Sequence, residues 1–377
     1  MTALRAACRT VLDASWRPTD GFCPPNPTVY PHQWLWDSCF HTIAWAALGD
    51  RRGVTELGSC LRGQLPSGFV PHMRYLGPTV DRGPLPDRSS YTQPPIYAHA
   101  ARVLHEAGFT LPVETLPAIG RALEWLWRDR RTDDGLVYLV HPWESGADDS
   151  PRWDSWIGLD SYDRDSYRDV DRRLVTDTVY DDDGAARWSH SFVAAPAAFN
   201  ALVAHAFGEL AHLTDDSMWA DRSAELAASI DRLLWHDESG LWQDRAIVGG
   251  GSSVAVPTLD GALPLLVTDD AEKASRVLDQ LLDPARFAAP YGLRYVWADH
   301  PRYDPDAYWR GPAWPQLNYL VWVAARRWGR DDLAAEIAGW SRAAAVRSGF
   351  AEFWNPETGA GRGAIPQGWA ALAAVYP

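Results

Sequence analysis

The segment WLWRDRRTDDGLVY, residues 125–138, runs from a Trp-bearing stretch into a turn. Two further stretches follow the same course, LLWHDESGLWQD at 233–244 and EFWNPETGAG at 352–361. Each places Asp or Asn shortly before Gly, and these residues favour a turn because Gly accepts positive φ while Asp or Asn caps the local backbone. This weak repeat predicts a helical unit that recurs along the chain, with its turns gathered at one end.

Most of the remaining sequence is also predicted to be helical. It is rich in Ala and Leu with Trp on the apolar faces, and few stretches show the two-residue alternation of strands. Turn signals delimit about twelve helices, over residues 2–15, 37–49, 51–63, 96–108, 117–131, 189–213, 217–236, 258–268, 271–283, 312–329, 331–348 and 366–375. Paired helices with recurring turns at one end suggest an all-α ring. No Pro-, Gly- and Ser-rich linker divides the chain, so we expect a single domain over residues 1–377.

Two regions do not fit a helical pattern. Residues 64–95 are rich in Pro and Gly, and residues 158–187 mix Asp, Arg and Tyr. Long loops inside a compact domain are usually functional or mobile. We expect both regions to be loops at the rim of a site, with solvated spacers as the alternative.

Composition narrows the classes of function. The 377 residues are 46% hydrophobic and carry a net charge of -14, which disfavours binding to nucleic acid. No signal peptide or membrane-spanning run is evident, so we expect a cytoplasmic protein without membrane association. The four cysteines form no metal-binding pattern and are expected to be reduced and mostly buried. The 21 Trp and 14 Tyr residues suit a carbohydrate site or an aromatic core.

Carboxylates gather beside aromatic residues in HPWESGADDSPRWDSW, residues 141–156. They are Glu144, Asp148, Asp149 and Asp154. Carboxylates packed beside indoles are desolvated and repel each other, and both effects raise the pKa of at least one of them. A carboxylic acid that is protonated near neutral pH is what glycoside cleavage requires.

A second group of acids lies in SGFAEFWNPETGAGRG, residues 348–363, where Glu352 and Glu357 adjoin Phe353 and Trp354. One of these two glutamates could act as a general base. Taken alone, either acidic segment could equally consist of helix caps and surface turns.

Six motifs together resemble glycoside hydrolase family 63, and in particular its bacterial mannosylglycerate and glucosylglycerate hydrolase branch. They are WLWDSCFH at 34–41, GFVPHM at 68–73, YTQPP at 91–95, WESGADDSPRW at 143–153, YWRGPAWPQLNY at 308–319 and FAEFWNPETGAG at 350–361. The resemblance implies an (α/α)6 toroid with long active-site loops, and an α-glycosidase that hydrolyses its substrate with inversion at the anomeric carbon.

The resemblance also implies roles for individual residues. Asp148 corresponds to the general acid and Glu352 to the general base, with Glu357 as a weaker candidate. An inverting pair should lie about 6.5–9.5 Å apart to leave room for water. The substrate-binding residues implied by the motifs are Tyr30, Trp34, Trp36, Asp37, His72, Gln93, Trp143, Tyr308, Trp309, Trp314 and Gln367. Core packing is the alternative for the aromatic residues, and helix capping or turn bonding for Asp37 and Gln93.

We expect no metal and no cofactor in catalysis. The spacings of His99 with His105 and of His205 with His212 differ from that of helical zinc ligands, and DDDG at 181–184 lacks the later ligands of a calcium loop. Two other functions stay open, a sugar epimerase on the same ring, which should use paired histidines, and a carbohydrate-binding protein without catalysis. The expected partner is a small carbohydrate, and homo-oligomerisation is left open.

The sequence departs from the glycerate-specific branch in one place. An Arg-Pro-Thr-Asp stretch, which helps to hold the glycerate carboxylate in that branch, corresponds most closely to Leu174-Val175-Thr176-Asp177. The arginine of that stretch, which supplies the positive charge for the glycerate carboxylate, is therefore displaced or missing in this sequence. The candidates to replace it are Arg172 and Arg173 just upstream, and Arg74, Arg82 and Arg88 in the first loop.

Overall fold

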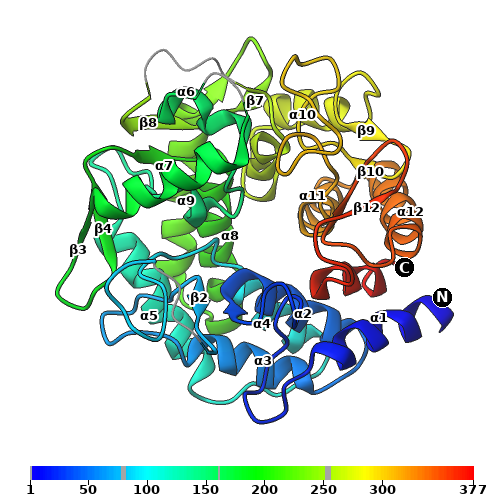
Figure 1. The fold of residues 1–377 in the computed structure, drawn as a ribbon, viewed down its shortest axis with the longest axis horizontal. Helices are drawn as coiled ribbons and strands as arrows, with labels where there is room; N and C mark the ends of the chain where they lie inside the picture. The colour runs from blue at the N-terminus through cyan, green and yellow to red at the C-terminus, as the bar shows by residue number, and fades with distance from the viewer. Residues whose placement is uncertain (1, 78–81, 160–161, 251–255) are drawn as a thin grey trace.

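The computed structural model describes residues 2–77, 82–159, 162–250 and 256–377, and its helices form a closed ring (Figure 1). Neighbouring inner helices contact each other, and the last contacts the first. In ring order the inner helices are α2 (Leu35–Ala47), α4 (Tyr97–Glu106), α8 (Ala197–Thr214), η3 (Leu259–Leu266), α11 (Pro315–Arg327) and η4 (Gly368–Ala374). The ring is the inner layer of the predicted (α/α)6 toroid.

An outer helix packs behind each inner one. The outer helices are α1 (Thr2–Ser15), α3 (Arg52–Leu61), α5 (Thr115–Asp129), α9 (Ser217–Leu233), α10 (Ala271–Leu281) and α12 (Asp331–Arg347). In this order α1 contacts η4, α3 contacts α2, α5 contacts both α4 and α8, α9 contacts α8, α10 contacts η3, and α12 contacts α11. Inner and outer helices thus alternate along the chain, which confirms the predicted fold class.

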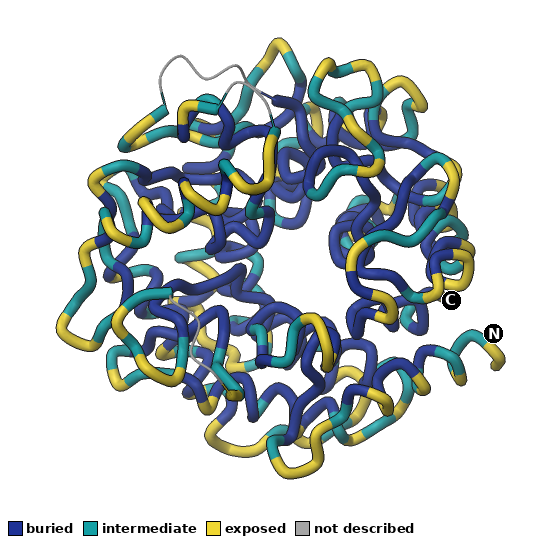
Figure 2. Tube along the Cα trace, in the orientation of Figure 1, coloured by how far each residue is buried: buried dark blue, intermediate teal, exposed yellow. Residues whose placement is uncertain are grey.

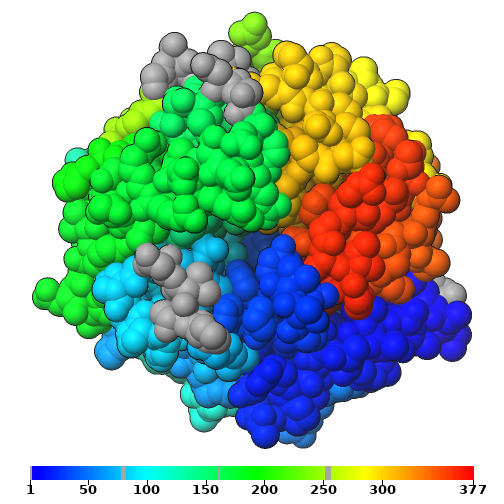
Figure 3. Space-filling view, in the orientation of Figure 1, coloured from blue at the N-terminus to red at the C-terminus, as the bar shows by residue number. Residues whose placement is uncertain are grey.

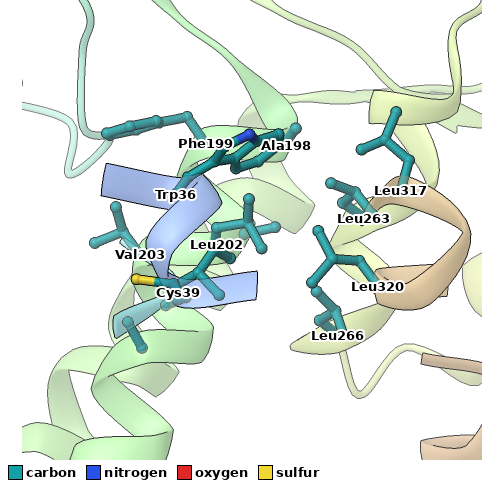
Figure 4. Close-up of a cluster of buried hydrophobic side chains, with 14 of the residues drawn as sticks. Trp36, Cys39, Ala198, Phe199, Leu202, Val203, Leu263, Leu266, Leu317 and Leu320 are labelled. Atoms are coloured by element: carbon teal, nitrogen blue, oxygen red, sulfur yellow. The ribbon is translucent and has the colours of Figure 1, made fainter. Parts of the chain in front are cut away.

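The sequence decides which layer a helix joins. Residues Leu35 to Ala46 of α2 are all buried, because an inner helix has protein on every side. The outer helix α10 buries one stripe, which includes Ala274, Val277 and Leu278. Buried segments therefore line the ring and exposed ones surround it (Figure 2). Side chains from α2, α8, η3 and α11 belong to one hydrophobic cluster (Figure 4).

The connections differ in length at the two ends of the ring. Short turns lead from each inner helix to the next outer helix, whereas long segments lead from each outer helix back to an inner one. The repeated turns lie in these long segments, where Gly135, Gly240 and Gly359 all have positive φ, as predicted. All the sequence motifs therefore gather at the end of the ring where the inner helices begin.

The long segments hold short antiparallel pairs and minor helices. The pairs are β1 (Gln33–Trp34) with β2 (Met73–Arg74), β3 (Thr178–Tyr180) with β4 (Ala186–Ser189), β5 (Val193–Ala195) with β8 (Arg245–Val248), β6 (Trp235–His236) with β7 (Leu241–Trp242), β9 (Ala288–Ala289) with β10 (Gly292–Leu293), and β11 (Phe353–Trp354) with β12 (Gly361–Arg362). The minor helices are η1 (Pro142–Ser145), η2 (Pro151–Trp153), α6 (Asp154–Ile157) and α7 (Arg164–Thr176).

Four predicted elements need correction. The helix predicted over 189–213 begins at Ala197, because Pro196 precedes it and residues 193–195 form β5. The segments predicted as helices over 258–268 and 366–375 are 3-10 helices, the first with Pro264 inside it. Residues 158–187 are not a plain loop, since they contain α7, β3 and β4. Residues 78–81 and 160–161 of the two predicted loops lie outside the described residues.

The predicted state of the cysteines is confirmed, since Cys8, Cys23, Cys39 and Cys60 are free and buried.

Among the described residues, no helix combines the length and the apolar character that crossing a membrane requires.

Candidate active site

A cavity of about 290 Å³ opens at the end of the ring where the inner helices begin. The space-filling view is hollowed near its centre, where the N-terminal, middle and C-terminal parts of the chain meet (Figure 3). Most of the predicted site residues line this cavity: Tyr30, Trp34, Trp36, Asp37, Gln93, Trp143, Asp148, Tyr308, Trp309, Glu352 and Gln367. The motifs thus converge on one small pocket.

Glu352 is anchored in this pocket by its neighbours. It lies at the start of the β11–β12 hairpin, where Ala364 N–H donates to Glu352 Oε2 at 2.8 Å. The Tyr30 hydroxyl donates to the carboxylate from 3.1 and 3.2 Å. Burial raises the pKa of Glu352 to about 7, against the opposing effect of these donors and of the Arg164 charge. The carboxylate is therefore held in place and titrates near neutral pH.

Asp148 follows the η1 turn, which Gly146 ends in the left-handed region at φ 76°. A side chain at the Gly146 position would press on the Trp36 ring, since a Cβ there would lie 3.2 Å from it. Burial, and then the neighbouring Asp149 charge, raise the pKa of Asp148 well above its ordinary value. Asp148 thus has the electrostatic setting of a protonated acid, as predicted for this segment.

Tyr308 shows that the two carboxylates share one site. Burial raises the pKa of Tyr308, and the charges of Asp148 and Glu352 add to this effect. Tyr30 is likewise influenced by both acids. The two carboxylates therefore face a common space bordered by tyrosine hydroxyls.

The remaining acids of the 141–156 segment have structural partners. Glu144 is fully buried and forms a two-pronged ion pair with Arg130 at 2.7 and 3.0 Å. Asp154 pairs in the same way with Arg310 at 2.7 and 2.8 Å. Asp149 lines the cavity and accepts a hydrogen bond from the Tyr162 hydroxyl at 3.0 Å.

Glu357 is also engaged elsewhere. Arg294 contacts both of its oxygens, at 2.6 and 2.9 Å, and the Tyr303 hydroxyl donates to it at 2.7 Å. Burial acts to raise the pKa of Glu357, but these partners bring it below the ordinary value. Glu357 does not line the cavity, so the geometry favours Glu352 over it.

A buried polar pair covers one wall of the pocket. Gln367 Nε2 donates to Asp37 Oδ1 at 3.3 Å, and Gln93 Oε1 accepts from the Trp36 backbone at 3.3 Å. Burial raises the pKa of Asp37 to about 7. Gln367 Oε1 has no hydrogen-bond partner among the described residues. This wall can receive sugar hydroxyls beside the ring faces of Trp34 and Trp36.

Two predicted binding residues lie behind the cavity rather than at its surface. His72 Nδ1 lies 2.8 Å from the Ser89 hydroxyl and 3.2 Å from the Tyr91 carbonyl oxygen, and its ring lies 6.3 Å from that of Trp143. Trp314 stacks under Trp309 at 3.6 Å. Both side chains therefore support aromatic residues that line the cavity instead of lining it themselves.

The stack also holds an unusual backbone. Trp309 has φ 56°, a left-handed conformation that a bulky residue rarely adopts and that costs about 1–3 kcal/mol. Burial of its indole against Trp314 offsets this cost. The neighbouring Tyr308 ring lies edge-on to both indoles, at 6.1 and 5.4 Å, and lines the cavity.

Residues 158–187 were predicted to border the site, but as a loop; one wall of the pocket is formed by the helix α7, and its lining residues were not predicted. Arg164, Arg168 and Asp171 line the cavity at i, i+4 and i+7, so they share one face of this helix. The buried residues of α7 are Tyr167, Val170 and Leu174. The i, i+3, i+7 spacing of these apolar residues is the signal that could have predicted the helix, but it is sparse in a strongly polar segment.

Of the five arginines proposed to replace the displaced cation, only Arg82 lines the cavity in the described part of the chain. Its guanidinium lies 3.7 Å from the centre of the Trp143 ring. The others point elsewhere: Arg172 pairs with Asp169, Arg88 with Asp87, Arg74 bonds Gln33, and Arg173 is exposed. Arg164 and Arg168 were not among the candidates.

No histidine or cysteine lines the cavity in residues 2–77, 82–159, 162–250 and 256–377. The site therefore lacks the paired histidines expected of a sugar epimerase. Its titratable groups are carboxylates, arginines and tyrosines, a set suited to proton transfer at a glycosidic bond.

Comparison with known proteins identifies the family. The mannosylglycerate hydrolase MGH1-like glycoside hydrolase domain matches residues 30–370. Mannosylglycerate hydrolase of Thermus thermophilus is 31% identical over 94% of this chain and 96% of its own length. Glucosylglycerate hydrolase of Mycolicibacterium hassiacum is 28% identical, with 93% and 92% covered.

A solved structure extends this likeness to three dimensions. The GH63 mannosylglycerate hydrolase of Thermus thermophilus, in complex with Tris and D-glycerate, superposes with a TM-score of 0.81 at 30% identity, covering 98% of this chain and 99% of its own. This chain therefore belongs to the mannosylglycerate hydrolase MGH1-like branch of glycoside hydrolase family 63, as the motifs indicated, and is a glycoside hydrolase.

Proposed function

We propose that this enzyme hydrolyses a small α-glycoside of glycerate, with glucose or mannose as the sugar, and that it inverts the anomeric carbon. One observation carries the proposal: a carboxylate pair and three arginines line the same cavity of about 290 Å³. A pocket of this size suits a monosaccharide conjugate rather than a polymer. The ring of residues 1–377 would act as one catalytic domain.

In the proposed reaction Asp148 protonates the glycosidic oxygen while Glu352 removes a proton from the attacking water. The C–O bond to glycerate breaks as the water oxygen bonds to the opposite face of the anomeric carbon, through an oxocarbenium-like transition state. The raised pKa of Asp148 supports its role as the acid. Glu352 is held by Tyr30 and Ala364, which fixes the direction from which water can attack.

The aglycone would lie beside the arginines. Arg164 sits over the Tyr308 ring at 4.9 Å and acts electrostatically on both Asp148 and Glu352, so it lies near the scissile bond. Arg82 lies across the cavity on Trp143, and its buried Nε has no hydrogen-bond partner in the described ranges. A glycerate carboxylate could accept charge-assisted hydrogen bonds from such guanidinium groups. The arginines thus make the cavity locally more positive, although the whole chain has a net charge of -14.

Product stereochemistry tests the proposal. Proton NMR of the reaction with α-mannosylglycerate and α-glucosylglycerate should show the β-anomer of the free sugar first, and the α-anomer only as it mutarotates. Early α-sugar would exclude inversion. Binding of both conjugates without any release of sugar would instead indicate a binding protein.

Removal of Arg164 tests recognition of the carboxylate. We expect Arg164→Gln to lower kcat/KM for the preferred glycerate conjugate by about 10- to 100-fold, the value of a charge-assisted hydrogen bond of about 1.5–3 kcal/mol. The same variant should lower kcat/KM for the corresponding glycerol conjugate by a clearly smaller factor, because that conjugate has no carboxylate to bond and loses only the effect of Arg164 on Asp148 and Glu352.

Because Arg164 also influences the catalytic carboxylates, the comparison of two substrates within one variant separates aglycone binding from catalysis. Arg172→Gln is the matched control, since Arg172 is exposed on the same helix and pairs with Asp169. Equal losses on the charged and uncharged conjugates would place the carboxylate elsewhere.

A further inference from the structure

Two inner helices bring together three side chains of metal-ligating types outside the active site. His99 of α4 meets His205 and Glu209 of α8. His99 Nδ1 lies 2.8 Å from Glu209 Oε1, His205 Nε2 lies 3.1 Å from the same oxygen, and the two nitrogens are 3.3 Å apart. Three potential donor atoms from two helices therefore surround a single point.

The surroundings orient these donors. His99 Nε2 is hydrogen-bonded to the Tyr319 hydroxyl of α11 at 2.8 Å, which leaves Nδ1 facing the cluster. Arg102 contacts the second oxygen of Glu209 at 3.1 Å, which leaves Oε1 facing the two histidines. His99 and Glu209 are buried, and His205 is nearly so. Metal-binding histidines are commonly fixed through the other ring nitrogen in this way.

We propose that His99, His205 and Glu209 bind a divalent first-row transition metal, of which Zn²⁺ fits the donor set best. Zn–N and Zn–O bonds are about 2.0–2.2 Å long, and donor atoms separated by 2.8, 3.1 and 3.3 Å can all lie at that distance from one ion. Two imidazoles and a carboxylate are an established zinc ligand set.

The site has room for a fourth ligand. A second cavity, of about 570 Å³, is lined by His205, Glu209 and Arg102, by one face of the outer helix α9 and by the ends of η3 and α11. It shares no lining residue with the catalytic cavity. A water molecule from it could complete a tetrahedral arrangement.

The metal would stabilise the ring of helices rather than take part in the reaction. Trp36 of the active site packs on Phe40, and Phe40 packs on Tyr319, so aromatic side chains separate the two sites. None of the three ligands lines the catalytic cavity. Through Tyr319 the cluster links α4 and α8 to α11, which lies across the ring from α4. A bound ion would therefore lock three inner helices together.

The other group of side chains of metal-ligating types, Cys23, His41 and Glu56, has no cavity beside it in the described structure. Glu56 Oε1 already accepts from the Cys23 backbone at 3.1 Å and contacts His41 at 2.9 Å, while Oε2 accepts from Trp45 Nε1 at 3.0 Å. All three side chains are fully buried, and none lines a described cavity. Both oxygens of Glu56 are therefore already engaged within the protein, and His41 Nε2 is left without a partner among the described residues.

Zinc titration of the full chain after chelator treatment tests the proposal. We expect one equivalent of Zn²⁺ to bind and to raise the melting temperature, because a ligand that binds only the folded state stabilises it. Co²⁺ bound in its place should give the visible absorption of a tetrahedral ion. His205→Gln and Glu209→Gln should each abolish the absorption and the thermal shift, while turnover well below the melting temperature stays within about twofold, an effect too small to represent a lost catalytic group.

His212→Gln is the matched control, since His212 is exposed on the same helix, and it should bind like the original chain. The proposal is overturned if the folded, chelator-treated protein binds no Zn²⁺ or Co²⁺, or if both Gln variants bind them unchanged. Circular dichroism establishes that each variant is folded. If His205→Gln does not fold, Glu209→Gln alone decides the outcome, because an amide oxygen preserves shape but is a much weaker ligand.

Discussion

Asp148→Asn is expected to lower kcat for a glycerate conjugate by about 10³-fold, within the range that general acid catalysis contributes. The amide keeps the shape of the carboxyl group but cannot protonate the leaving oxygen, so substrate affinity should stay within a few-fold. The α-glycosyl fluoride of the same sugar provides a sharper measurement, because fluoride leaves without being protonated. On that substrate we expect the variant to retain most of its kcat.

Asp149→Asn is the matched control for this prediction. Asp149 adjoins Asp148 and lines the same cavity, but it accepts a hydrogen bond from Tyr162, and its charge serves to raise the pKa of Asp148. Its replacement should move the alkaline limb of the pH profile to lower pH and reduce kcat far less. Equal losses on the fluoride and the glycerate conjugate in Asp148→Asn would contradict a general acid role.

The fold could be predicted because its signals are local. Trp-bearing segments at or just after the end of an outer helix run into Asp- or Asn-containing turns with Gly, and Gly135, Gly240 and Gly359 adopt the positive φ that these turns require. The helix α7 was missed because its outer face is charged and its buried face is narrow. The segment before α8 was predicted as part of the helix because the apolar residues of β5 lead into α8 without a polar residue between them.

The site was predicted less completely, for a different physical reason. Motif residues could be assigned to one pocket, but the sequence does not show which aromatic ring lies in front of another. Trp309 faces the cavity and Trp314 supports it, although both belong to one motif. The pairing of Glu357 with Arg294 joins residues 63 positions apart. Contacts of this kind depend on the closed ring and leave no local pattern.

Glu352→Gln is expected to lower kcat by about 10³- to 10⁴-fold, because the proposed general base is replaced by an amide that cannot deprotonate the attacking water. The amide can still contact Tyr30 and Ala364, so the pocket should keep its shape. Azide needs no base, and adding it should restore cleavage and give the β-glycosyl azide. Mass spectrometry and NMR of the product measure this rescue directly.

Glu357→Gln is the matched control, since it lies in the same segment and loses an ion pair with Arg294. It should lower thermal stability and leave the chemical step nearly unchanged. A larger fall in kcat for Glu357→Gln than for Glu352→Gln would show that the base had been assigned to the wrong glutamate.

The pH profile of the rescued variant decides the role of Glu352. A base works only when ionised, and the pKa of Glu352 is raised to about 7, so the original enzyme should lose kcat/KM as the pH falls through about 7. Asp37 and Asp171 titrate in the same range, each with a pKa raised to about 7, so the profile of the original enzyme alone does not assign this limb. In Glu352→Gln with saturating azide the limb should disappear if Glu352 is the base. If this limb persists in the variant, the group that titrates is one of the two aspartates, because neither of them is altered there.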